Sequence, residues 1–184
     1  VPALAETWNG GGTDDLWTNP ANWGGSAPAS SNTTNIVITG STRLTPSVDT
    51  NDPWVLNTLT FNNSVTPVGS FTLGGNAISF QGTGGDTLIN NSGVTQTVAN
   101  DIDWKGVLKP NSGALVLNGD ITINMSDLLV RAGGTATLNG QISGTRSLTR
   151  TDSGTTIVTN AANNFPGGVS VSHGVLQTAS IADA

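Results

Sequence analysis

Few side chains in this 184-residue sequence could act as nucleophile, acid or base. It contains no cysteine, and His173 is its one histidine, so a Ser-His-Asp triad would depend on that single imidazole. The Gly-x-Ser-x-Gly motif that presents the nucleophile of many hydrolases is absent. Because His173 falls in an expected turn, we interpret it as an ordinary surface residue.

Paired carboxylates would be needed for the hydrolysis or elimination of polysaccharides. The candidate pairs are Asp14 and Asp15, Asp49 and Asp52, and Asp101 and Asp103. Asp101 and Asp103 would point to the same side of a strand. No acidic cluster recurs about 20 residues later, where Asp120 stands alone. We therefore interpret these acids as solvated turn residues and predict that the protein is not an enzyme.

One glycine-rich segment suggests a metal. Residues 81–89 read Gln-Gly-Thr-Gly-Gly-Asp-Thr-Leu-Ile, similar to a single calcium-binding nonapeptide with Asp86 as the ligand. Calcium needs several oxygen ligands, which such motifs supply from tandem copies, and residues 90–98 contain no aspartate. A glycine-rich turn with an exposed Asp86 is the simpler interpretation. Calcium at Asp86 is the one cofactor hypothesis that the sequence offers.

The composition excludes some partners and favours an all-β fold. Only 10% of the residues are charged, and the formal net charge is -6, so no basic surface for nucleic acid or anionic lipid is expected. No apolar run is long enough to span a membrane. Val, Ile, Leu and Thr recur in short alternating runs, which favour ordered strands over disorder.

A glycine recurs about every 20 residues in the second half of the sequence. The repeat contains a glycine, an aliphatic residue five or six positions before it, and an alternating run after it. The glycines are Gly93, Gly113, Gly134, Gly154 and Gly174, and the aliphatic residues are Leu88, Leu108, Leu129, Leu148 and Val169. Valines at odd positions after Gly93 suggest that this copy is shifted by one residue.

A unit of this length with two or three short strands cannot enclose a core by itself, but stacked units can, at ~4.8 Å per step. We therefore predict a single-stranded parallel β-helix of about 20 residues per coil, right-handed by default. Asn118-Gly119 and Asn139-Gly140 are expected to supply positive φ at its corners. A sandwich would not repeat the same residues at this period, and a propeller blade needs about 40 residues.

The β-helix is expected over residues 36–184, regular from about residue 88, with about seven coils in all. Upstream, strand-like runs span residues 36–38, 55–61, 70–73, 77–80 and 87–89. Residues 1–35 form a separate N-terminal segment that holds Trp8, Trp17 and Trp23. We predict that these rings cap the solenoid. The alternative is a stacking platform for sugars.

The two ends suggest export and association. An Ala-x-Ala pattern in residues 1–5 is typical of the end of a signal peptide, so these residues are either a signal-peptide remnant or the start of the mature chain. We predict secretion to the cell surface or beyond. The last repeat starts at Gly174 and runs only about half a coil, to Ala184. This open finish predicts either self-association end to end or continuation in a longer chain.

The segments Gly140-Gln-Ile-Ser-Gly144, Ser147-Leu-Thr-Arg150, Asn163-Asn-Phe165-Pro-Gly-Gly and Gly174-Val-Leu176 follow one another in the last coils. Together they resemble the autotransporter-associated β-strand repeat of bacterial surface proteins, with Arg150 at a usual Lys and Phe165 at a usual Tyr. The Trp-Asn-Gly-Gly…Asn-Trp start is also similar to that family. The resemblance implies a secreted bacterial β-helix, and it does not specify an activity.

The leading prediction is thus a secreted structural solenoid, displayed on a bacterial surface as an adhesin-like module or assembled into an extracellular filament. A carbohydrate-binding module is the first alternative, through the Trp-rich end or rows of Thr and Asn that would contact a surface glycan. A carbohydrate-active β-helix enzyme is the second alternative.

Overall fold

Short runs of alternating apolar and polar residues determine the architecture. Successive side chains of a strand point to opposite faces, so each run has one face to bury. The computed structural model describes residues 4–83 and 85–179, and it stacks these runs in parallel as an all-β solenoid of about 7 turns with ~21 residues per turn. The predicted parallel β-helix and its number of coils are confirmed.

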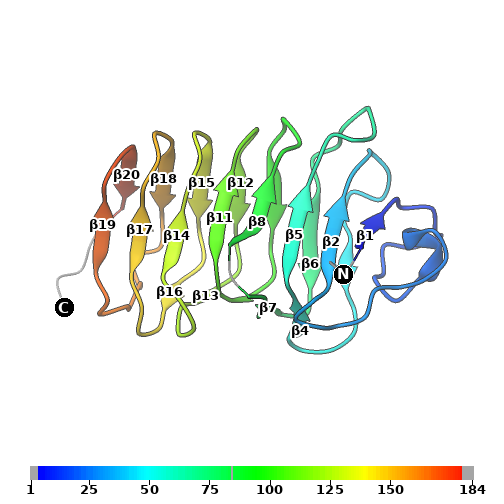
Figure 1. Ribbon diagram of the computed structural model, residues 1–184, viewed down its shortest axis with the longest axis horizontal. Coiled ribbons are helices and arrows are strands. Elements are labelled where there is room, and N and C mark those ends of the chain that lie inside the picture. Colours follow the sequence, from blue (N-terminus) through cyan, green and yellow to red (C-terminus); the bar gives the residue numbers. More distant parts are fainter. Residues whose placement is uncertain (1–3, 84, 180–184) are drawn as a thin grey trace.

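The strands form three parallel sheets. The first contains β1 (Ala5–Trp8), β2 (Asn35–Ile38), β5 (Thr58–Phe61), β8 (Asp86–Asn90), β11 (Val107–Pro110), β14 (Leu128–Val130), β17 (Leu148–Arg150) and β19 (Val169–Val171). The second contains β3 (Ser47–Val48), β6 (Thr72–Gly75), β9 (Gln96–Val98), β12 (Leu115–Leu117), β15 (Thr135–Leu138), β18 (Thr155–Val158) and β20 (Val175–Thr178). The third contains β4 (Trp54–Leu56), β7 (Ile78–Phe80), β10 (Ile102–Asp103), β13 (Ile121–Thr122) and β16 (Ile142–Ser143). Figure 1 shows the coils side by side, with β1 and the blue N-terminal segment at one end and β19 and β20 at the other.

Buried side chains of successive coils form a continuous column inside each sheet. These columns contain Ile36, Leu59, Leu88, Leu108 and Val130 in the first sheet, Leu73, Val98, Leu117, Leu138 and Val158 in the second, and Trp54, Ile78, Ile102, Ile121 and Ile142 in the third. Each such side chain stabilises the fold by about 1.5–3 kcal/mol through burial. The columns make the core continuous from coil to coil.

The strand registers correct two of the sequence predictions and confirm a third. Leu129 is not the core residue of its coil, because the alternation of β14 buries Leu128 and Val130 instead. The run at residues 55–61 is two strands, since the chain turns at Asn57 from β4 to β5. The expected shift of the Gly93 copy is confirmed: Gln96, three residues after the glycine, pairs with Leu115, two residues after Gly113.

The N-terminal segment packs three indole rings against the first coil. Trp23 makes edge-to-face contacts with Trp8 and Trp17 at centroid distances of 5.2 and 5.3 Å, and Trp17 meets Trp54 at 4.8 Å. The 3-10 helix η1 (Pro20–Trp23) places Trp23, whose Nε1 donates to the carbonyl oxygen of Trp17 at 2.8 Å. The segment also supplies β1, which pairs with β2. Residues 1–3 of the expected signal-peptide remnant lie outside the described residues.

The Asn-Gly corners differ from the prediction. Neither Gly119 nor Gly140 has a positive φ. Instead, the backbone of the preceding coil runs directly against them: a Cβ on Gly119 would lie 2.0 Å from the carbonyl oxygen of Asn100, and one on Gly140 would lie 1.9 Å from that of Gly119. Glycine is required here for the close approach of two coils, because any side chain would collide with backbone.

Candidate functional site

Five of the six acids paired in the sequence analysis, all but Asp103, have hydrogen-bond or ion-pair partners on neighbouring segments. Asp14 accepts from the Asn19 side chain and from the Leu16 N–H, and these bonds lower its pKa. Asp15 forms an ion pair with Arg43, Asp49 accepts from the Thr18 N–H, Asp52 accepts from the Ala77 N–H, and Asp101 accepts from the Asp120 N–H. Such carboxylates satisfy backbone donors at the corners, where the sheets leave them unpaired. Asp101 is thus bonded to the next corner, whereas Asp103 belongs to β10.

The calcium candidate Asp86 faces a cation. Its Oδ2 lies 2.6 Å from Nζ of Lys109 on the next coil. Residues 4–83 and 85–179 contain no group of three or more His, Cys, Asp or Glu side chains that could hold a metal ion. A single carboxylate that already has an ion-pair partner supplies fewer oxygens than calcium takes.

His173 lies in the turn where the sequence placed it, and the three N-terminal tryptophans are covered. His173 lies exposed in the turn between β19 and β20. Trp8, Trp17 and Trp23 are at most 7% exposed. A sugar ring could not stack on rings that are already covered, so the alternative of a Trp platform at this end is wrong, and the rings belong to the core.

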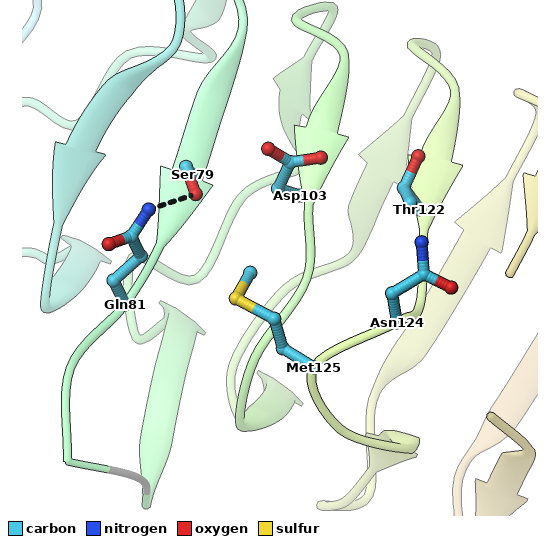
Figure 2. Close-up of a pocket in the computed structure, with 6 residues that line it drawn as sticks. All are labelled: Ser79, Gln81, Asp103, Thr122, Asn124 and Met125. Carbon is cyan, nitrogen blue, oxygen red and sulfur yellow. Dashed lines mark hydrogen bonds between the residues drawn. The ribbon is translucent and has the colours of Figure 1, made fainter. Parts of the chain in front are cut away.

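A polar hollow lies instead on the outer face of the third sheet. Three side chains of this face follow one another on adjacent strands: Ser79 on β7, Asp103 on β10 and Thr122 on β13. Loop residues Gln81, Asn124 and Met125 complete a hollow of about 240 Å³. Figure 2 shows Asp103 between Ser79 and Thr122, with Met125 opposite it and flanked by Gln81 and Asn124.

The hydrogen bonds of the hollow hold its edges and leave its centre free. Gln81 Nε2 donates to Ser79 Oγ at 3.0 Å, which fixes one edge. Asn124 Oδ1 accepts from the Thr145 N–H at 3.1 Å, which fixes the other. Within the described part of the chain, the carboxylate of Asp103 and the hydroxyl of Thr122 have no hydrogen-bond or ion-pair partner. Met125 is 39% exposed.

The sequence contained a signal for half of this site that was missed. An isoleucine followed by a small or acidic polar residue recurs in the third sheet: Ile78-Ser79, Ile102-Asp103, Ile121-Thr122 and Ile142-Ser143. The isoleucines form the inner column, so the residues after them must share the outer face. No sequence pattern of this kind identifies Gln81, Asn124 and Met125, because they lie in loops of unrelated sequence that border the hollow.

The lining of the hollow supplies hydrogen-bonding groups and a single carboxylate. It combines acceptors on Asp103, a hydroxyl on Thr122, two amides and an exposed thioether. Glycoside hydrolysis needs two carboxyl groups facing one bond, and the lining of this hollow contains one.

Comparisons of the sequence with family profiles and with curated proteins, and of the fold with solved structures, gave no match. In the part of the chain that the structure describes, no helix has the length and apolarity to cross a bilayer.

Proposed function

We propose that this chain is an exported structural β-solenoid that associates end to end, as a surface-displayed, adhesin-like module or as a subunit of an extracellular filament. One observation carries the proposal: the coil formed by β19 and β20 exposes side chains that continue the inner columns. Val169 and Val171 pair with Leu148 and Arg150 but are 40% and 44% exposed.

This face has the properties of an association surface. Among the described strands, β19 and β20 have a neighbour on one side only, so their outer N–H and C=O groups are available to another strand. A further coil, whether from a second copy or from a continuation of the chain, would cover the valines and pair the edge at the same time, and the proposal here is a second copy. The opposite end differs, since the Trp-rich segment packs over the first coil there.

Export to the surface is supported by the sequence alone. The Ala-x-Ala pattern in residues 1–5 and the resemblance of the last coils to the autotransporter-associated repeat both favour a secreted bacterial protein. The absence of a second carboxylate beside Asp103 favours a structural role over a carbohydrate-active enzyme.

Sedimentation velocity over a wide concentration range, together with electron microscopy, tests the proposal. We expect wild-type protein to form end-to-end dimers or filaments, and Val171→Lys to shift it to monomer because a charge would be buried in the contact. Val65→Lys, at an exposed loop valine far from this coil, is the matched control and should associate like wild type. A wild-type protein that stays monomeric, or Val171→Lys that associates normally, refutes the proposal.

A further inference from the structure

The hollow on the third sheet has a regular internal spacing. Ser79, Asp103 and Thr122 occupy three successive strands, so the row rises by ~4.8 Å at each step and spans about 10 Å. Loop side chains Gln81 and Met125 extend it on one side. A volume of about 240 Å³ lies below the ~300 Å³ at which pockets begin to enclose drug-sized ligands. Ser79 at one end of the row is fully buried, so the accessible part lies over Asp103 and Thr122, and the hollow suits one ring of an oligosaccharide whose other rings stay exposed.

We propose that this hollow is a binding site for a neutral oligosaccharide. The two free oxygens of Asp103 are strong acceptors for the hydroxyl groups of a sugar, and Thr122 can donate or accept beside them. Asn124 is held through its Oδ1, which leaves its amide nitrogen facing the hollow as a donor. The exposed thioether of Met125 offers an apolar contact for the C–H face of a ring.

Charge selects the class of sugar. The lining contains one carboxylate and no cationic side chain, and the whole chain has a formal charge of -6. Uronic acids, sulfated sugars and phosphates would bring a second negative charge against Asp103, which favours neutral hexoses and N-acetylhexosamines even with Arg146 Nε 3.4 Å from the carbonyl oxygen of Asn124 beside the hollow. A metal ion would find only the one carboxylate as an anionic ligand, which is fewer than calcium sites provide.

This inference is independent of end-to-end association. The hollow lies over β7, β10 and β13, whereas the exposed coil is that of β19 and β20. The hollow is also a different site from the Trp platform considered for sugars, whose rings are covered. Few contacts and partial exposure predict weak binding, with a Kd on the order of 1 mM for a short oligosaccharide.

Amide chemical shifts recorded during titration with cellotetraose, maltotetraose and N-acetylchitotetraose test the site, with tetragalacturonate as the acidic comparison. At least one neutral probe should shift amides of residues 78–81, 102–104 and 121–126. Asp103→Asn should weaken binding about tenfold, the equivalent of one charge-assisted hydrogen bond. Asp86→Asn makes the same chemical change on another sheet and should bind like wild type.

Since the Asp103 carboxylate has no partner in the described chain, Asp103→Asn should keep the dispersion of the spectrum. Met125→Ala, at an exposed loop position, gives a second reading and should weaken binding by about threefold. The proposal is overturned if no neutral probe binds at concentrations well above its expected Kd, if tetragalacturonate binds best, or if both variants bind like wild type.

Discussion

Replacing Gly140 by alanine places a methyl group where two coils touch. The new Cβ would lie 1.9 Å from the carbonyl oxygen of Gly119, a backbone atom that cannot rotate away. Real contacts of this kind stay beyond 3.0 Å, so the coils must separate locally by about 1 Å. Hydrogen bonds flank this point on both sides: Asn139 N–H to Leu117 O at 2.8 Å and Gln141 N–H to Asp120 Oδ1 at 2.7 Å.

The magnitude follows from these contacts. Overpacking typically costs about 1–3 kcal/mol, and weakening two inter-coil hydrogen bonds adds about 1 kcal/mol each at most. We expect Gly140→Ala to lower the free energy of unfolding by about 3 kcal/mol. Gly74→Ala is the matched control, because Gly74 lies in β6 without a positive φ and a Cβ there would meet nothing within 4 Å. That change should be neutral or stabilise by up to about 1 kcal/mol through the unfolded chain.

Guanidinium denaturation, followed by tryptophan fluorescence and far-ultraviolet circular dichroism, measures both variants. The free energies are compared after confirming that the denaturant slopes are equal, since a changed slope would indicate loss of a cooperative transition. If Gly140→Ala stays within about 0.5 kcal/mol of wild type, the close approach of the coils is not what requires glycine at these corners.

Two further predictions concern charge. Hydrogen bonds from the Ser147 and Ala132 N–H groups lower the pKa of Asp127 and Asp152, so the folded values lie below the unfolded value of about 3.9. The stability that these two carboxylates contribute is therefore complete above the unfolded pKa and is lost as the pH falls through the folded values. Thermal midpoints should drop below about pH 4. If Asp127→Asn shows the same drop as wild type, the carboxylate of Asp127 does not contribute to it. Arg150 is 1% exposed, its Nη1 has no partner in the described structure, and burial lowers its pKa. Arg150→Met should raise the unfolding free energy by about 1 kcal/mol, and a loss of stability on chemical denaturation would show that the bonds of the guanidinium to the carbonyls of Ala132 and Asp152 outweigh its burial.

The sequence alone was sufficient for the architecture. A repeat of about 20 residues, too short to enclose a core, can bury its alternating apolar residues only by stacking, and this requires a parallel solenoid. The clustering of Trp8, Trp17 and Trp23 ahead of the first clear strand likewise predicted a covered end. These inferences depend only on which residue types recur and at what spacing, and both can be read from the amino-acid sequence.

Only the tertiary structure determined contacts between particular atoms of neighbouring coils. Leu129 and Leu128 are one residue apart, and the pleat of β14 decided which of them is buried. The need for Gly140 came from a carbonyl oxygen twenty-one residues earlier, not from its own φ. The same holds for the hollow around Asp103, where loops bring Gln81 and Met125 together. Coils differ in length by a residue or more, so which side chains meet between two coils depends on how each corner folds. The average repeat length in the sequence does not contain this information.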